Sequence, residues 1–250
     1  MKNKKINRCD IFVFITLLMC ACAHKSGHGE RVMISSNYKN EGVQKENGRL
    51  DNYAKTIKRK GGKMEGPEIF RKYTSAVFMV FTSDGRNTYQ GSGFFINNHG
   101  LAVSNYHVFK GTGIGIEEIK LAGSDVVYKV TDIIQKSLDR DFIIFKVNCD
   151  DTNYIPIATN KPKVGEKVFA IGSPRGLENT FSSGEVSQWR DQNLMQISAL
   201  IDHGSSGGAL INEYGEVIGI TSGTFYDGSQ ANLNYAWSID VIKSYITMKD

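Results

Sequence analysis

All five histidines of this 250-residue chain precede the glycine-rich segment Gly204-Ser-Ser-Gly-Gly208. A serine among glycines, followed by the apolar run 209–211, is typical of a tight turn that can aim two backbone N–H groups at one point. Such a serine becomes a nucleophile when a histidine takes its proton. In the nucleophile elbow of α/β-hydrolases that histidine follows the serine. This fold is therefore excluded, and the base for Ser206 must lie upstream.

His107 and Asp141 are the best upstream partners for Ser206. His107 follows the predicted strand 101–104, and Asp141 opens the strongly apolar run 141–147. The histidine would accept the serine proton, and the aspartate would orient the imidazole and stabilise it when it is charged. The order histidine, aspartate, serine is that of the chymotrypsin-like proteases.

Two other residues compete for these roles. Asp139 is an alternative acid, but only Asp141 stands directly at the start of the strand, so we favour Asp141. His203 is too close in sequence to Ser206 to be an obvious base, and we expect it on the surface or at the rim of the cleft.

Three motifs in this order resemble those of trypsin-like serine proteases, most closely the bacterial HtrA (Deg) type. Ser104-Asn105-x-His107-Val108 is similar to Thr-Asn-x-His-Val of that family, Asp141 with its apolar run to Asp-Ile-Ala, and Gly204-Ser-Ser-Gly-Gly208 to Gly-Asn-Ser-Gly-Gly. The resemblance covers residues 67–240. It implies a serine endopeptidase that cleaves polypeptides by acyl transfer, with the histidine and aspartate in one barrel and the serine in another.

The same resemblance implies further site residues. The backbone N–H groups of Gly204 and Ser206 would form the oxyanion hole. Ser222 matches a family position beside the triad acid, and Ser222, Gly223 and Thr224 would pair with the substrate backbone as an added strand. The family's PDZ-based assembly is not implied, because the chain ends soon after the last predicted strand.

Leu200 is predicted to set the specificity of cleavage. In the trypsin-like architecture the residue six positions before the nucleophile lies at the floor of the primary specificity pocket, and here that residue is Leu200. An apolar floor offers no partner to a lysine or arginine side chain. Asp202 is expected to face away from the floor. We therefore expect cleavage after small or medium apolar residues such as Val, Ala, Ile or Leu.

Short β-rich runs broken by turn signals such as Asp84-Gly85 indicate an all-β protein. No βαβ alternation is present, and helices are predicted only at 67–73 and 240–247. Twelve strands are enough for two six-stranded antiparallel β-barrels of the chymotrypsin-like kind, with a short C-terminal helix. The predicted strands are 75–82, 91–96, 101–104, 115–121, 126–134, 141–147, 167–172, 180–189, 194–200, 209–212, 217–225 and 234–239.

Residues 1–23 are typical of an export signal, with a basic region followed by a short apolar region from Ile11 to Ala23. This apolar region is too short for a permanent membrane span. Ala21-x-Ala23 suits an ordinary signal peptidase, whereas Met19-Cys20-Ala21-Cys22 resembles a lipoprotein signal with a lipid on Cys22. Both interpretations stay open, so the sequence predicts a protein exported from a bacterial cell to the periplasm, to the outer membrane as a lipoprotein, or to the medium.

Residues 24–65 form a basic segment of low apolar content, which we interpret as a disordered linker before a protease domain at 66–250. The segment holds ten Lys or Arg against five Asp or Glu. It is either a solvated linker or a segment attracted to an anionic membrane surface. Because the basic excess lies in these first residues, the net charge of +4 does not indicate nucleic-acid binding by the folded domain.

The remaining features point to a metal-free enzyme. No His/Cys cluster has the spacing of metal ligands, so no metal or other cofactor is expected. Cys149 is the single cysteine outside the first 22 residues and is expected to be a buried or half-buried small side chain. The alternative function is a catalytically silent protease-fold binding protein or adhesin, which the intact set of three residues disfavours. The oligomeric state is left open.

Overall fold

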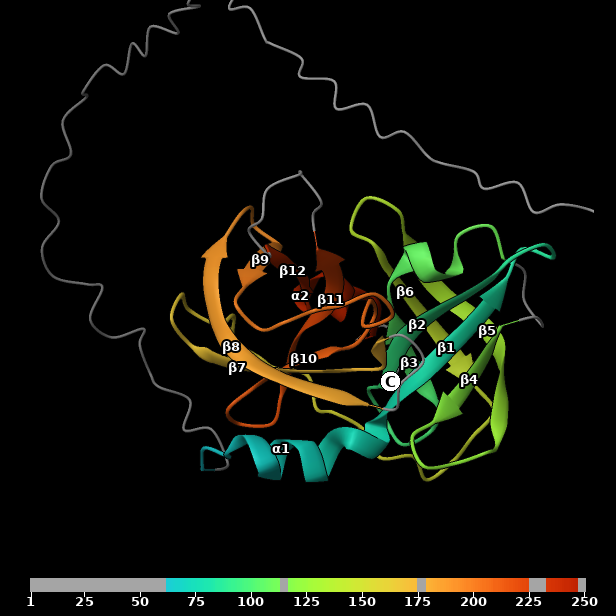
Figure 1. Ribbon diagram of the computed structural model, residues 1–250, viewed down its shortest axis with the longest axis horizontal. Coiled ribbons are helices and arrows are strands. Elements are labelled where there is room, and N and C mark those ends of the chain that lie inside the picture. The colour runs from blue at the N-terminus through green and yellow to red at the C-terminus, as the bar shows by residue number, and fades with distance from the viewer. Residues whose placement is uncertain (1–61, 113–116, 175–178, 225–232, 247–250) are drawn as a thin grey trace, which may run out of the picture. The chain divides into compact units, whose positions relative to one another are not determined.

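The computed structural model of the protein describes residues 62–112, 117–174, 179–224 and 233–246. These residues form two closed six-stranded barrels in which all neighbouring strands are antiparallel (Figure 1). The predicted all-β fold is therefore confirmed. The predicted export signal and almost all of the predicted linker lie outside the described residues.

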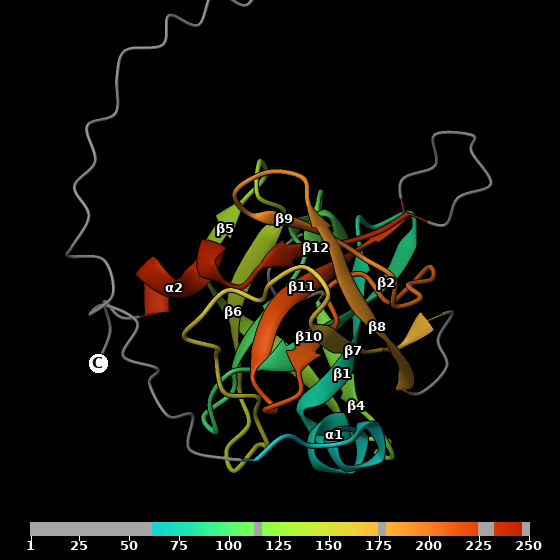
Figure 2. The same cartoon turned by 90° about the vertical axis from the view of Figure 1, so that its left-hand side faces the viewer.

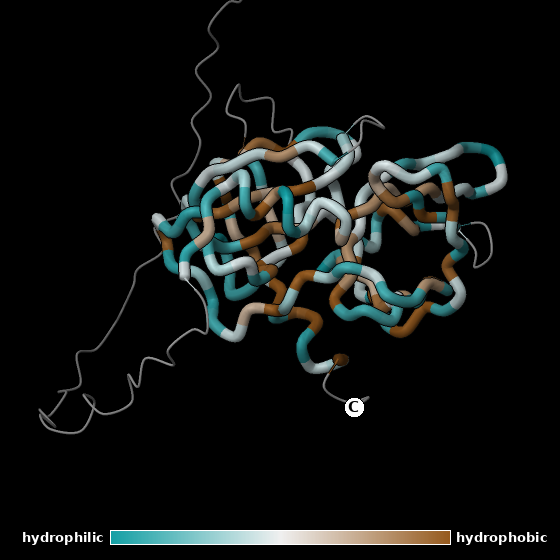
Figure 3. The backbone as a smooth tube through the Cα atoms, turned by 90° about the horizontal axis from the view of Figure 1, so that it is seen from below, coloured by the Kyte–Doolittle hydropathy of each residue, from teal (hydrophilic) through white to brown (hydrophobic). Residues whose placement is uncertain are grey.

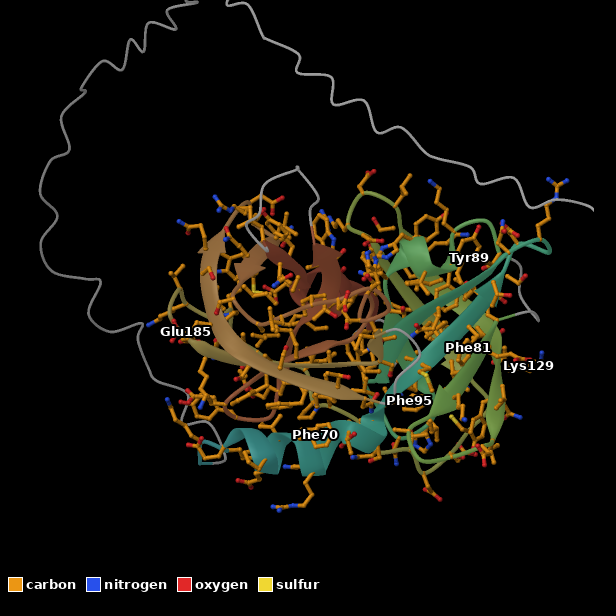
Figure 4. All side chains as sticks on the ribbon, viewed as in Figure 1. Phe70, Phe81, Tyr89, Phe95, Lys129 and Glu185 are labelled. Atoms are coloured by element: carbon orange, nitrogen blue, oxygen red, sulfur yellow. The ribbon has the colours of Figure 1, made fainter. Side chains whose placement is uncertain are left out.

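The first barrel has the strand order β1-β2-β3-β6-β5-β4, and β4 pairs with β1 to close it. Its core contains phenylalanine rings among aliphatic side chains, and the rings of Phe78 and Phe95 lie 4.6 Å apart between centroids. Both residues are fully buried. Phe95 is labelled in Figure 4. The strands are β1 Val77–Ser83, β2 Thr88–Phe95, β3 Leu101–Ser104, β4 Glu118–Leu121, β5 Val127–Ser137 and β6 Phe142–Val147.

The second barrel has the strand order β10-β11-β12-β9-β8-β7, and β7 pairs with β10 to close it. Met195, Leu210 and Ile218 are buried in its core. Apolar segments alternate with polar ones along the strands of both barrels, as expected for barrels with a filled interior (Figure 3). The strands are β7 Lys167–Gly172, β8 Thr180–Trp189, β9 Leu194–Ile197, β10 Ala209–Asn212, β11 Val217–Thr224 and β12 Asn234–Ser238.

β9 ends three residues before the predicted strand end at 200. Ser198 still bonds to β8, because its N–H donates to the Glu185 carbonyl at 3.0 Å, but the carbonyls of Ala199 and Leu200 are met by side chains. Asn234 Nδ2 donates to the Ala199 carbonyl at 3.0 Å, and Ser182 Oγ donates to the Leu200 carbonyl at 2.8 Å. The chain is thereby released from the sheet and becomes one wall of the pocket described below.

Two α-helices flank the barrels (Figures 1 and 2). α1 Gly66–Tyr73 packs on the second barrel, where the rings of Phe70 and Phe181 meet edge to face at 5.8 Å. α2 Asp240–Ile246 follows β12. None of the helices in the described residues is long and apolar enough to cross a membrane.

One apolar cluster contains residues from both barrels and both α-helices. It includes Phe94 and Val103 from the first barrel, Ile171 and Ile220 from the second, and Ile69 from α1. All five side chains are at most 1% exposed. This shared core fixes one barrel against the other and so sets the geometry of any site that uses residues from both.

Met64 belongs to this core, although we assigned residue 64 to the linker. Its side chain is 9% exposed, and its N–H donates to the Glu213 carbonyl at 2.7 Å. Lys63 Nζ lies 2.6 Å from a Glu213 carboxylate oxygen. Residues 62–65 therefore pack on the folded body.

Removing this contact is expected to lower the free energy of unfolding. A chain that begins at Gly66 should fold but be less stable than one that begins at Gly62, by about 1–3 kcal/mol, which is the usual contribution of a buried methionine. Urea unfolding of both chains measures the difference, with Met64→Ala in the longer chain as the matched variant. Equal midpoints for all three proteins would show that Met64 contributes nothing.

Candidate active site

Asp141 holds His107 through two hydrogen bonds. β3 ends at Ser104, and the chain then makes the short 3₁₀-helix Tyr106–Phe109, which carries His107. Asp141 Oδ2 lies 2.8 Å from His107 Nδ1, and Asp141 Oδ1 accepts the His107 backbone N–H at 2.9 Å. Ring and backbone of the histidine are thus fixed by one carboxylate, which favours the tautomer with a proton on Nδ1.

The backbone of Asp141 is in the left-handed region, with φ at +44°. An aspartate tolerates this conformation better than most residues, but it persists only when the surroundings hold it. The buried Asn105 does so, because its Nδ2 donates to the Asp141 carbonyl at 2.7 Å. Asp139 is exposed and has no such contact in the described part of the chain. The structure therefore brings Asp141, and not Asp139, to the histidine.

Ser222 approaches the same carboxylate from the second barrel. Its Oγ donates to Asp141 Oδ2 at 2.8 Å. The register of β11 against β12 shifts between Thr221 and Gly223, so that Ser222 is the extra residue of a bulge. A bulge redirects a side chain out of the regular alternation. Here the Ser222 hydroxyl points to the Asp141 carboxylate of the first barrel.

Ser206 lies in a turn that packs tightly against the first barrel. Gly207 has φ at +88°, and a Cβ atom there would lie 2.2 Å from the Ser92 carbonyl oxygen, so no other residue fits. Gly223 passes on the other side, where a Cβ would lie 3.4 Å from Ser206 Oγ. Among the described residues the Ser206 hydroxyl has no hydrogen-bond partner, so the bond from Ser206 to His107 is not formed. Such bonds are often formed only when a substrate is bound.

Two N–H groups of the serine turn are left without an acceptor in the described residues. Ser205 N–H donates to the Asp202 carbonyl at 2.9 Å and Gly207 N–H to the Thr221 carbonyl at 2.7 Å. The N–H groups that alternate with these, on Gly204 and Ser206, find no such partner. They are the two donors that the sequence predicts for an oxyanion hole.

A cavity of about 450 Å³ opens beside Ser206. Leu200 lines it but is 68% exposed, so it does not form a buried floor. Ile201, the next residue, also lines the cavity and is 7% exposed. Asp202, which was expected to face away from the floor, and His203 are exposed lining residues as well. The other lining residues are Ala170, Ile171, Gly172, Pro174, Thr180, Phe181, Ser182, Ser205, Thr221, Gly223 and Asn234.

Two further residues were singled out in the sequence, Thr224 and Cys149. The side chain of Thr224 is outside the described residues. Cys149 is half-buried, and burial followed by the negative charge of Asp150 raises the pKa of its thiol. A thiol with a raised pKa stays protonated at neutral pH and is a poor nucleophile.

Sequence reasoning gave no function to four residues that contact the candidate site or line its cavity. Asn105 is part of the histidine motif but was given no function, and Ser92 and Thr221 were given none either. Ile201 was overlooked because the pocket floor was placed one position earlier. A serine between two glycines, as at 91–93, was the available signal for Ser92. The partners of Asn105 and Thr221 lie 36 and 16 residues away, so spacing alone does not reveal them.

The first barrel supplies a histidine bound to an aspartate, and the second supplies a serine flanked by glycines. Two closed antiparallel barrels with this arrangement define the chymotrypsin-like class of proteins. Residues 91–220 match the family described as the trypsin-like peptidase domain. Because this match covers more than half of the chain, the protein belongs to that family.

Comparison with known proteins narrows the class further. The chain is 32% identical over 197 residues to a protein of Halomonas elongata named probable periplasmic serine endoprotease DegP-like. The aligned region covers 72% of this chain and 41% of the relative. The chain is 29% identical over 194 residues to Protease Do-like 5, chloroplastic, of Arabidopsis thaliana, covering 68% of this chain and 60% of the relative. The predicted HtrA-type resemblance is confirmed, although the chain spans less than two thirds of either relative.

A solved structure has the same fold. The serine endoprotease from Yersinia pestis superimposes with a TM-score of 0.66 at 23% identity, covering 75% of this chain and 67% of that one. At this identity the likeness concerns the fold.

Proposed function

We propose that the protein is a serine endopeptidase that cleaves polypeptides through an acyl-enzyme intermediate. The observation that carries the proposal is the hydrogen-bonded pair of His107 and Asp141, at 2.8 Å. The same fold presents Ser206 on a turn in which two N–H groups have no acceptor among the described residues. Aspartate-bound imidazole is suited to accept a proton from a serine hydroxyl and later to return it to the leaving amine.

In the proposed mechanism Ser206 Oγ attacks the carbonyl carbon of the scissile peptide bond, and His107 takes its proton. The negative charge that develops on the carbonyl oxygen is stabilised by the N–H groups of Gly204 and Ser206. Collapse of this intermediate breaks the C–N bond, and His107 protonates the amine that leaves. Water, deprotonated by His107, then hydrolyses the acyl-enzyme and restores the serine.

The relatives support the proposed substrate class and compartment. The periplasmic DegP-like relatives support an exported bacterial protein whose substrates are polypeptides. Lipid attachment at Cys22 remains part of the proposal, and its test is metabolic labelling with a fatty acid.

We expect cleavage after Val, Ala, Ile or Leu, because Ile201 gives the cavity beside Ser206 a buried apolar wall. A lysine or arginine side chain would lose several kcal/mol there unless a carboxylate met it, so apolar residues should be preferred by at least about tenfold. Digestion of a mixed peptide library, with sequencing of the new termini, measures both the endopeptidase activity and this preference.

Asp202 supplies the control for this experiment, since it is the one carboxylate among the described residues that line the cavity. Asp202→Asn should leave the cleavage pattern of the library unchanged. A dominant preference for Lys or Arg that disappears in Asp202→Asn would show that this carboxylate, and not Ile201, defines the pocket. A library left intact by the wild-type protein would overturn the proposed function itself.

A further inference from the structure

The serine turn is held by its carbonyl oxygens. The Gly204 carbonyl accepts a hydrogen bond from Ser92 Oγ at 2.7 Å. The Ser205 carbonyl accepts one from Thr221 Oγ1 at 2.7 Å and another from the Gly208 backbone N–H at 2.9 Å. The Ser206 carbonyl accepts the Ser92 backbone N–H at 2.8 Å. Three successive carbonyls are thus fixed by two residues outside the turn.

Each fixed carbonyl also fixes an N–H group. The peptide unit is planar and trans, so the carbonyl of one residue and the N–H of the next point in opposite directions. With its carbonyl directed at Thr221 Oγ1, Ser205 forces the Ser206 N–H to point away from Thr221. On that side no acceptor among the described residues meets it, which leaves the N–H available to a substrate.

The two supporting hydroxyls have little freedom of their own. Thr221 is 1% exposed, and its β-branched side chain is restricted at χ1. Ser92 is fully buried on β2, and its Oγ accepts the Ser173 N–H at 2.8 Å. The Ser92 hydroxyl oxygen thus accepts a backbone N–H, while its hydrogen is donated to the Gly204 carbonyl. The Ser92 carbonyl is itself held by Ser104 Oγ at 2.7 Å.

We propose that Thr221 and Ser92 are positioning residues of the oxyanion hole. Thr221 sets the direction of the Ser206 N–H from within the second barrel. Ser92 fastens the carbonyls of Gly204 and Ser206 from the first barrel and so holds the turn on both sides of the Ser206 N–H. Donors fixed before the substrate arrives need no reorganisation when charge develops, and this is the condition under which they lower the barrier most. The inference rests on the proposed function.

Thr221→Val removes the supporting hydroxyl and nearly keeps the shape of the side chain. We expect kcat for peptide hydrolysis to fall by roughly tenfold to a hundredfold, less than the 10²–10³-fold for deleting an oxyanion donor outright. KM should stay within about twofold, because the loosened N–H matters mainly in the transition state. Affinity for a peptide boronate, whose tetrahedral adduct on Ser206 places an oxygen in the hole, should fall by a similar factor. Ser92→Ala should act in the same direction.

Thr82→Val is the matched control. Thr82 is 1% exposed and donates to the Val108 carbonyl at 2.7 Å, so its removal costs a comparable buried hydrogen bond. It should lower Tm about as much as Thr221→Val does while leaving kcat and boronate affinity within about twofold of wild type. Thr221→Ser, which keeps the hydroxyl, should retain wild-type kcat.

The outcomes separate this inference from the proposed function. If the wild-type protein is active and both Thr221→Val and Ser92→Ala keep its kcat, the inference alone is overturned. An equal loss of kcat in Thr82→Val would also overturn it, because the effect would then be general destabilisation. A wild-type protein without hydrolytic activity would overturn both proposals. If Thr221→Val does not fold, Ser92→Ala and Thr221→Ser decide the question.

Discussion

Replacing Ser206 with alanine is expected to lower kcat for peptide hydrolysis by roughly 10⁶-fold while the protein stays folded. The loss is large because the nucleophile of the proposed acyl transfer disappears. The fold should be unaffected, because the Ser206 hydroxyl has no hydrogen-bond partner among the described residues. Steady-state kinetics on a peptide substrate and a thermal melt of the same sample measure the two effects.

His107→Ala should lose about as much activity as Ser206→Ala, and the double variant should lose no more than either, because the two residues act as one unit. The single thiol of the folded body provides the control. Cys149→Ala should keep wild-type kcat, since the raised pKa of that thiol argues against a nucleophilic role. Additive losses in the double variant would contradict a shared step.

Asp141→Asn is expected to lower kcat by roughly 10⁴-fold, the loss that follows when the histidine is held in the wrong tautomer. The carboxylate of Asp141 accepts from the His107 ring, the His107 N–H and Ser222 Oγ. The asparagine side chain has a single oxygen to accept from these three donors. Its NH₂ group would be placed against another donor, with which it cannot form a hydrogen bond.

Asp139→Asn is the matched control for this prediction. Asp139 is exposed and lies two residues from Asp141, so the same change of charge is made on the same turn. Its kcat should stay within about twofold of wild type. A large loss for Asp139→Asn together with retained activity in Asp141→Asn would reverse the assignment of the acid.

Much of the fold could be predicted because turn signals bound the strands sharply. The predicted ranges 101–104, 167–172, 180–189 and 209–212 coincide with β3, β7, β8 and β10. The strand predicted at 194–200 was too long, because side chains of residues far away in sequence, and not a neighbouring strand, meet the carbonyls of Ala199 and Leu200. Periodicity does not report such contacts.

The candidate site also has one part that could be predicted from the sequence and one part that could not. Motif order was enough to select His107, Asp141 and Ser206, because each stands at a strand end or in a glycine-rich turn. The supporting contacts of Ser92 and Thr221 could not be predicted, since they depend on how the two barrels meet and not on local sequence. Leu200 shows why counting along a loop does not locate a pocket floor, because a shift of one residue exchanges an exposed side chain for a buried one.

Labelling with a fluorophosphonate probe tests the assignment of the nucleophile most directly. The probe reacts with a serine only when its hydroxyl is activated by a base and the developing oxyanion is stabilised. We predict that the wild-type protein is labelled once, that mass spectrometry places the adduct on Ser206, and that labelling disappears in Ser206→Ala and His107→Ala. An unlabelled wild-type protein, or an adduct that persists in Ser206→Ala, would contradict the account.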